Sequence, residues 1–320
     1  MIASRNAVAL SQVILTARTL TAQAAKAKTA KLILTLINLF ASLPESATEG
    51  KKGLTLILDE AITWARQTSR QHLAQSLSLS LASHYLAVKQ YRAALALLSQ
   101  LTPELKRLDD KHLLTTIHLL SSLTYHRLHN LPKAKAELTS ARTAAGSVYV
   151  GQAVQARLDL MSGVVNAEEG DWKTAYSYFF ESFEGLCAVL EQEEKGGKGT
   201  AGDGFGGGGG PLVVDWGMAV GSSGGGGAGM QALTALKYML LCKIMLNAVR
   251  ESMDMFEWFV LTHRPSKAED VTTLLSVKLA AKYADHREVE SMKAVARAHA
   301  NRNLGEFRKA LKDYREGACW

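Results

Sequence analysis

Four histidines fall close together in the middle of the chain, and imidazole is well suited to bind a transition metal or to move a proton near neutral pH. They are His112, His118, His126 and His129. His126 and His129 are three residues apart and can share one face of a helix. A zinc site needs further carboxylate or thiolate ligands at suitable spacing, and the neighbouring sequence has none. We therefore expect core or outer-face histidines and no metal site.

Two glycine-rich stretches have part of the spacing of nucleotide-binding loops. Gly202–Gly207 has loose GxGxxG character, but a dinucleotide site needs a strand before it and a helix after it, and neither is predicted. Gly197–Thr200 is similar to the end of a phosphate loop, but Gln192 stands where that motif requires glycine. A low-complexity linker is the preferred interpretation, with no cofactor. An enzyme that holds phosphate with this loop is kept as an alternative.

The cysteines and serines do not form a recognisable active site either. Cys187, Cys242 and Cys319 are far apart and odd in number, and no CxxC pair occurs. Neither a zinc knuckle nor a disulfide framework is supported, which favours a reducing compartment. No nucleophile-elbow sequence brings serine, histidine and aspartate together. These patterns predict a protein that is not an enzyme.

The composition predicts a folded chain with a sizeable core. Apolar residues make up 47% of the 320 residues, and no unbroken apolar run reaches the roughly 18 residues that span a bilayer. The net charge is +7, but lysine and arginine alternate with acidic residues, which favours a solvated surface over a nucleic-acid site. The basic stretch before Glu45 fits an ordinary helix, with a mitochondrial presequence as the alternative.

A pattern of three positions recurs about every forty residues. An aromatic or polar residue is followed six positions later by a bulky apolar residue, and three positions after that by alanine. Corresponding positions are 40 residues apart (125 − 85) and then 41 (166 − 125). The copies are Tyr85–Tyr91–Ala94, Tyr125–Leu131–Ala134, Asn166–Trp172–Ala175 and, more faintly, Asn301–Phe307–Ala310. This period predicts an all-α, right-handed α-solenoid of TPR-like helical hairpins, each stacked on the next.

Helical periodicity covers most of the chain. Lys133 and Glu137 are expected to pair on an outer face. The expected core face consists of Trp172, Ala175, Tyr176, Phe179, Phe180 and Phe183. Whether Met253–Leu261 forms a helix is left open. The predicted helices are Ala7–Leu20, Ala24–Leu43, Leu54–Gln67, His72–Val88, Tyr91–Leu101, Lys111–His129, Pro132–Thr143, Val148–Glu168, Asp171–Leu190, Ala232–Asn247, Ala268–Tyr283, Arg287–Ala300 and Gly305–Glu316.

Two stretches interrupt the predicted solenoid. Residues 1–195 are expected to form helical repeats, followed by a glycine-rich, low-complexity insertion over 196–230, where dense glycine makes ordering costly in entropy. Residues 231–247 are expected to be one solenoid helix, 248–267 an irregular insertion, and 268–320 the last helical repeats.

Three segments also resemble a known family. Residues 130–143 (NLPKAKAELTSART), 171–179 (DWKTAYSYF) and 237–247 (KYMLLCKIMLN) are similar to the PCI-domain, non-ATPase clamp subunits of the 26S proteasome lid. The similarity runs from about Ala7 to Glu316, apart from the two interruptions. The second subunit of the COP9 signalosome has a stretch similar to 171–179, but the amino-acid sequence of 237–247 favours the proteasome family.

The resemblance implies a scaffold in ubiquitin-dependent protein degradation. Members of the family bridge the ATPase ring and the core particle, and a C-terminal winged helix joins them to other lid subunits. The implied partners are lid subunits, ATPase-ring subunits and the core-particle α-ring, with no nucleic acid, membrane or small-molecule substrate. The implied location is the cytoplasm and nucleus. A signalosome scaffold is the alternative.

The chain departs from the family pattern at four places. It ends at Trp320, where relatives continue into the winged helix, and Met1 enters partway through the solenoid, so we expect a truncated member. Residues 196–230 and Val249–His263 have no counterpart in the family. One hypothesis for Val249–Arg264 is a translated intron, which transcript reads would test.

Overall fold

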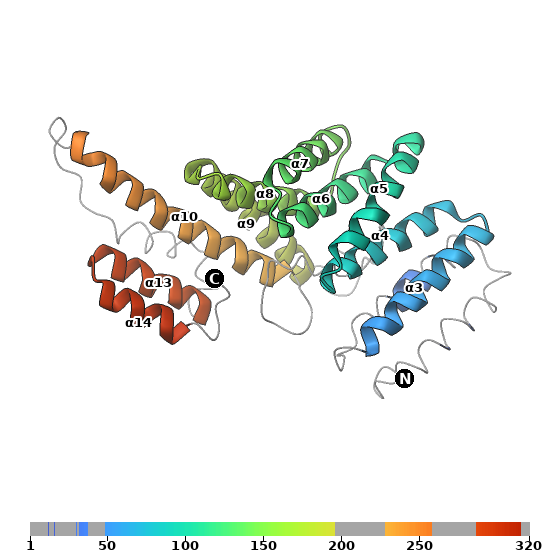
Figure 1. The fold of residues 1–320 in the computed structure, drawn as a ribbon, viewed down its shortest axis with the longest axis horizontal. Coiled ribbons are helices and arrows are strands. Elements are labelled where there is room, and N and C mark those ends of the chain that lie inside the picture. Colours follow the sequence, from blue (N-terminus) through green and yellow to red (C-terminus); the bar gives the residue numbers. More distant parts are fainter. Residues whose placement is uncertain are drawn as a thin grey trace. The chain divides into compact units, whose positions relative to one another are not determined.

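The computed structural model describes residues 12, 16, 30, 32–37, 49–195, 228–257 and 286–314. Every regular element in these ranges is an α-helix, as Figure 1 shows. The prediction of an all-α solenoid is therefore confirmed. Backbone contacts divide the chain into two compact units, with the boundary between Gly151 and Gln152. This boundary falls inside the range 1–195 that was predicted as one set of repeats. The right-handed turn of the whole stack stays a prediction.

The first unit is a row of helices in which each packs against the next. It holds α3 (Glu49–Gln67), α4 (Gln71–Ala87), α5 (Tyr91–Leu108), α6 (Lys111–Arg127) and α7 (Leu131–Gly146). α4 also contacts α6, the first helix of the following hairpin. Ile33 and Ile37 pack beneath α3 and share its core with Leu58 and Leu77. Stacking of this kind lets one hairpin cover the apolar face of another.

α4 is buried almost all the way round, although its sequence alternates leucine and serine as an amphipathic strand would. Ser76, Ser78 and Ser80 are each at most 1% exposed. The Ser78 hydroxyl donates to the carbonyl of Ala74 (2.8 Å) and the Ser80 hydroxyl to that of Ser76 (3.0 Å). These bonds satisfy the hydroxyls inside the helix, so serine can be buried at little cost.

One turn geometry recurs between successive helices. A residue at or just after the helix C-cap has positive φ, and the N–H of the next residue donates to the carbonyl five positions earlier, as from Gln90 to Tyr85 (2.8 Å). This bond is that of a Schellman motif. Gln90 is also the N-cap of α5, so the chain reverses without further loop residues. The positive-φ residues are Ser69, Lys89, Asp109, His129, Gly170 and Arg302.

α5 is longer than the sequence predicts, because it continues past Leu101 to Leu108 with Pro103 inside it. An interior proline removes one backbone hydrogen bond and costs about 3 kcal/mol or more. Leu98, Leu101 and Leu105 are each 1–3% exposed and lie on one stripe of the helix. Their burial offsets that cost, at about 1.5–3 kcal/mol for each leucine.

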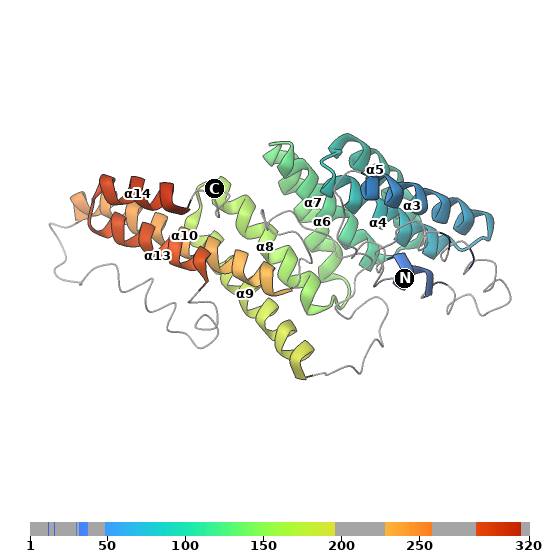
Figure 2. The same cartoon turned by 90° about the horizontal axis from the view of Figure 1, so that it is seen from below.

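The second unit contains α8 (Gln152–Glu168), α9 (Trp172–Lys195), α10 (Ala228–Glu257), α13 (Arg287–Ala300) and α14 (Leu304–Tyr314). α9 packs against both α8 and α10, and the three helices lie side by side in Figure 2. α10 also touches α8, where Arg157 Nε donates to Gln231 Oε1 (3.3 Å). Burial lowers the pKa of the Arg157 guanidinium. Segments far apart in sequence thus share one core.

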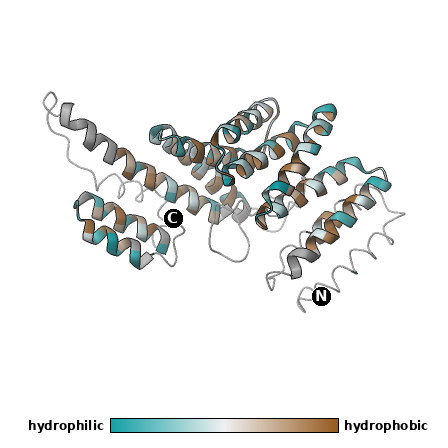
Figure 3. Ribbon diagram, viewed as in Figure 1, coloured by the Kyte–Doolittle hydropathy of each residue, from teal (hydrophilic) through white to brown (hydrophobic). Residues whose placement is uncertain are grey.

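α10 extends beyond the predicted Ala232–Asn247 at both ends, and it is helical over the part of 248–267 that reaches Glu257. Figure 3 shows hydrophobic residues along its middle. The window Gly229–Leu246 is long and apolar enough, by length and composition only, to cross a membrane, but 56% of it is buried inside the fold. Ala232, Leu236 and Leu240 have no exposed surface and pack in the core of this unit.

Several predictions lie outside the described residues. They are the helices Ala7–Leu20 and Ala24–Leu43 apart from the few positions given above, the helix Ala268–Tyr283, the glycine-rich stretch up to position 227, residues 258–267 and Cys319.

Candidate interaction surfaces

The first three copies of the repeated pattern occupy equivalent places in their hairpins. The first position lies in the last turn of one helix and accepts the Schellman hydrogen bond: the carbonyls of Tyr85, Tyr125 and Asn166 accept from the N–H groups of residues 90, 130 and 171. The second position, which is Tyr91, Leu131 or Trp172, begins the next helix and is partly buried. The third position is an alanine without exposed surface in each copy: Ala94, Ala134 and Ala175.

The fourth copy is out of register with the others. The N–H of Asn303 donates to Ala298, so the equivalent first and second positions are Ala298 and Leu304 instead of Asn301 and Phe307. Phe307 takes the place of the buried alanine, and Ala310 follows one turn later. Ala310 is 9% exposed and Phe307 packs against the core of the second unit. The fourth copy therefore has the expected spacing, but each of its residues lies three positions later in the hairpin than its counterparts in the other copies.

The four histidines separate in the structure, and no group of three or more potential metal ligands occurs among the described residues. His112 and His129 are exposed, and His126 is partly buried. His118 is buried on α6, and its Nδ1 lies 2.6 Å from Glu137 Oε2 on α7. Glu137 was predicted to pair with Lys133, but Lys133 Nζ instead lies over the Tyr125 ring, 5.6 Å from its centroid. The His118–Glu137 contact joins the two helices of one hairpin.

The aromatic face of α9 is a core face, with one exception. Phe179 and Phe183 are buried, and Trp172 and Tyr176 pack at the edge of the same cluster. The Phe179 ring stacks on Tyr238 of α10 with centroids 5.3 Å apart. Phe180 was expected in the core, but it is 37% exposed. It is one helical position beyond Phe179, and the turn of about 100° per residue carries it off the buried stripe.

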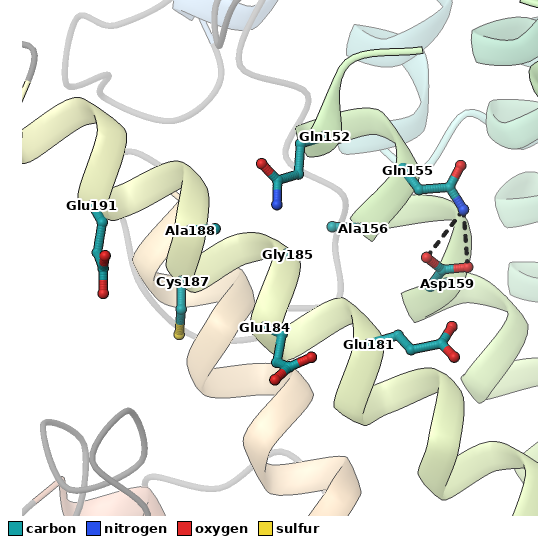
Figure 4. A pocket seen from close by; sticks show the side chains of 10 residues that line it. All are labelled: Gln152, Gln155, Ala156, Asp159, Glu181, Glu184, Gly185, Cys187, Ala188 and Glu191. Atoms are coloured by element: carbon teal, nitrogen blue, oxygen red, sulfur yellow. Dashed lines mark hydrogen bonds between the residues drawn. The ribbon is translucent and has the colours of Figure 1, made fainter. Parts of the chain in front are cut away.

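The second unit has an open groove of about 530 Å³ between α8 and α9, drawn in Figure 4. We call it the α8–α9 groove. Small residues keep it open: Gly185 faces Ala156, and a Cβ added to the glycine would meet the alanine Cβ at 3.1 Å. The remaining lining residues are Gln152, Gln155, Asp159, Glu181, Glu184, Cys187, Ala188 and Glu191.

The charged side chains that line the α8–α9 groove are all acidic, whereas the whole chain has a net charge of +7. Asp159 is 6% exposed and accepts two hydrogen bonds from Gln155 Nε2, at 3.1 and 3.3 Å. Glu181 and Glu184 are exposed on α9. Such a surface is complementary to lysine and arginine side chains of a partner protein, and complementary charge governs approach and orientation more than affinity.

Comparison with known proteins finds relatives in one family. A family model described as the 26S proteasome regulatory subunit RPN6 N-terminal domain matches residues 2–88. The probable 26S proteasome regulatory subunit rpn6 of Schizosaccharomyces pombe is 38% identical over 309 residues, which is 96% of this chain. The regulatory subunit RPN6 of Saccharomyces cerevisiae is 37% identical over 292 residues, or 91% of this chain. The chain is therefore similar to the Rpn6 regulatory subunits of the 26S proteasome.

The Rpn6 relationship extends across kingdoms. The 26S proteasome non-ATPase regulatory subunit 11 homolog of Arabidopsis thaliana is 38% identical over 291 residues. The chain spans 58% of the fission yeast protein and 54% of each of the other two. It therefore corresponds to somewhat more than half the length of these Rpn6 relatives.

Proposed function

We propose that this chain is a member of the Rpn6 family and a non-catalytic scaffold of the 26S proteasome lid. It works in ubiquitin-dependent protein degradation and bridges lid subunits, ATPase-ring subunits and the core-particle α-ring. Its place of action is the cytoplasm and nucleus. The observation that carries the proposal is the 38% identity over 96% of the chain to a proteasome regulatory subunit.

The architecture supports this role. Stacked hairpins expose a long outer surface while each buries its own apolar face against a neighbour, which is the usual basis of partner binding by solenoids. The α8–α9 groove offers one such surface, with exposed carboxylates on a rigid pair of helices. A partner that presents lysine or arginine is the kind of protein that would fit it.

Affinity purification of the tagged chain from its native cells, followed by mass spectrometry, tests the proposal. We expect lid and ATPase subunits to be enriched together. Enrichment of signalosome subunits, or of neither assembly, would refute it. A second comparison uses Glu181→Lys with Glu184→Lys, which reverses charge in the groove, against Glu168→Lys with Glu169→Lys at the other end of α8. Loss of partners with the first pair alone would locate binding in the groove.

A further inference from the structure

A second pocket lies wholly within the first unit, where the end of α3, the start of α4 and the end of α5 meet. It measures about 480 Å³. We call it the α3–α5 pocket. One stripe of α4 forms its floor, through Gln71, Ala74, Gln75 and Ser78, and the walls come from Arg66 on α3 and from Leu101, Glu104, Arg107 and Leu108 on α5. Its size is within the range of small-ligand and peptide side-chain sites.

Gln75 is the first polar group that the α3–α5 pocket offers to a ligand. The residue is only 7% exposed and lines the pocket floor. Its side-chain amide makes no hydrogen bond to another described residue, and it is not one of the fully buried polar groups that lack a partner. An amide on a pocket floor can donate its N–H₂ to a ligand.

Two arginines at the rim are the next such groups. Arg66 and Arg107 are exposed, and neither guanidinium forms an ion pair with any residue that the structure describes. They stand in the last turns of α3 and α5, where a cation interacts favourably with the helix dipole. Within the described residues, Glu104 is the carboxylate that lines the same pocket, and it forms no ion pair with either arginine.

The start of α4 adds a third, independent source of positive potential. Its N-cap is Arg70, which makes no side-chain cap hydrogen bond, and its first turn has no acidic residue. The starts of α5 and α13 also lack a side-chain cap, whereas Asp110, Asn130 and Asp171 accept from backbone N–H groups at the starts of α6, α7 and α9. An uncapped helix start attracts an anion through its unpaired N–H groups and its dipole.

We propose that the α3–α5 pocket binds the carboxylate of an acidic, leucine-containing peptide segment of a partner protein. The carboxylate accepts from Gln75 and from one or both arginines, and Leu101 and Leu108 contact the apolar neighbour. Glu104 also faces the pocket, so the formal charge of its side chains is +1 (two arginines, one glutamate). That balance favours a singly charged carboxylate over a doubly charged phosphate. The inference does not depend on membership of the proteasome.

The test is a fluorescence anisotropy titration of the full chain with a labelled eight-residue peptide of alternating glutamate and leucine. The same peptide with glutamine in place of glutamate is the first control. We expect measurable binding of the acidic peptide and at least tenfold weaker binding of the neutral one, since charge-assisted hydrogen bonds are about twice as strong as neutral ones. No binding below millimolar concentration, or equal binding of both peptides, would overturn the proposal.

Variants then locate the site. Arg107→Gln and Gln75→Leu are each expected to weaken binding about tenfold or more, because each removes a donor to the carboxylate. Arg92→Gln is the matched control, since Arg92 is exposed at the opposite end of the same helix, α5. An equal effect of Arg92→Gln and Arg107→Gln would show general attraction to a basic surface and would refute the pocket.

Glu104→Gln separates a binding role from a structural one. It removes the negative charge that faces the pocket, so we expect tighter peptide binding, about threefold or more. A gain in affinity cannot result from partial unfolding, which only weakens binding. A phosphoserine peptide of the same length serves as the last probe. If it binds more tightly than the glutamate peptide, the pocket prefers phosphate and the carboxylate assignment is wrong.

Discussion

Gly163 provides a sharp test of the packing between α8 and α9. It lies inside α8 against the Phe179 ring of α9, and a Cβ built on it would lie 2.6, 2.7 and 2.9 Å from three ring carbons. Favourable contacts between carbon atoms occur at about 3.5–4.0 Å. The ring is 1% exposed and stacks on Tyr238, so it has little room to move away. Gly163→Ala must therefore push the two helices apart or tilt the ring.

Two opposing terms set the size of the effect. Replacing glycine by alanine inside a helix contributes about 1 kcal/mol of stability. Overpacking a filled core costs about 1–3 kcal/mol, and three short contacts with a ring held on its other face place Gly163 at the upper end. The net expectation is a loss of about 2 kcal/mol. For a unit of this size, that corresponds to a fall in Tm on the order of 4–8 °C.

Urea unfolding followed by circular dichroism measures the loss, and a double-mutant cycle assigns its cause. In a Phe179→Leu background the ring is absent, so Gly163→Ala is expected to change sign and to stabilise by up to about 1 kcal/mol. Gly146→Ala is the matched control, because a Cβ at Gly146, the last residue of α7, meets nothing within 4 Å. If Gly163→Ala stabilises the wild-type chain as helix propensity alone would, the close contact is not real.

Four further substitutions test the turns and the core. Gly170→Ala, at φ 86°, should destabilise by about 1–2 kcal/mol in urea unfolding, and Lys89→Gly, at φ 65°, should stabilise by up to about 1 kcal/mol; the same sign for both would contradict the left-handed assignment. Asn130→Ala removes the cap on Lys133 N–H and should cost about 1 kcal/mol in the same assay; an unchanged midpoint would count against that cap. Burial raises the pKa of Cys242 from 9.0 to about 12, so its contribution to stability is complete below pH 9 and is lost as the pH rises towards 12. Cys242→Ala should therefore flatten the alkaline fall in Tm, and a parallel fall in variant and wild type would refute this.

The sequence reveals the hairpins because each one repeats the same backbone turn. The six-residue step from Tyr85 to Tyr91 is the distance from the carbonyl that accepts the Schellman bond to the first residue of the next helix. The left-handed residue of each turn cannot be recognised from the sequence, since Gly170 is the only glycine among the six such positions in the described residues. His129 was accordingly predicted inside a helix, although it has φ 56°.

The surfaces were harder to predict than the hairpins, because they depend on residues of different helices. Helical periodicity orders the side chains of one helix, but it does not say which side chain of a neighbour lies opposite. Glu137 is four residues from Lys133 and nineteen from His118, yet His118 is its partner. The opening beside Gly185 likewise requires Ala156 to face it from α8. The sequence indicates such a groove only through small residues on two neighbouring helices, and many helix pairs have small residues without forming a groove.

The packing of α10 on α8 and α9 has a consequence for how the chain tolerates change in length. Residues 196–227 join α9 to α10, yet the two helices are neighbours, and Arg157 is hydrogen-bonded to Gln231. The entropic cost of closing such a connection grows only with the logarithm of its length, by about 0.6 kcal/mol for each doubling. Halving or doubling the length of this connection would thus change the free energy of folding by less than the loss of one helix cap, which costs about 1 kcal/mol. By this estimate, the contact between α9 and α10 tolerates such a change in the number of residues between the two helices.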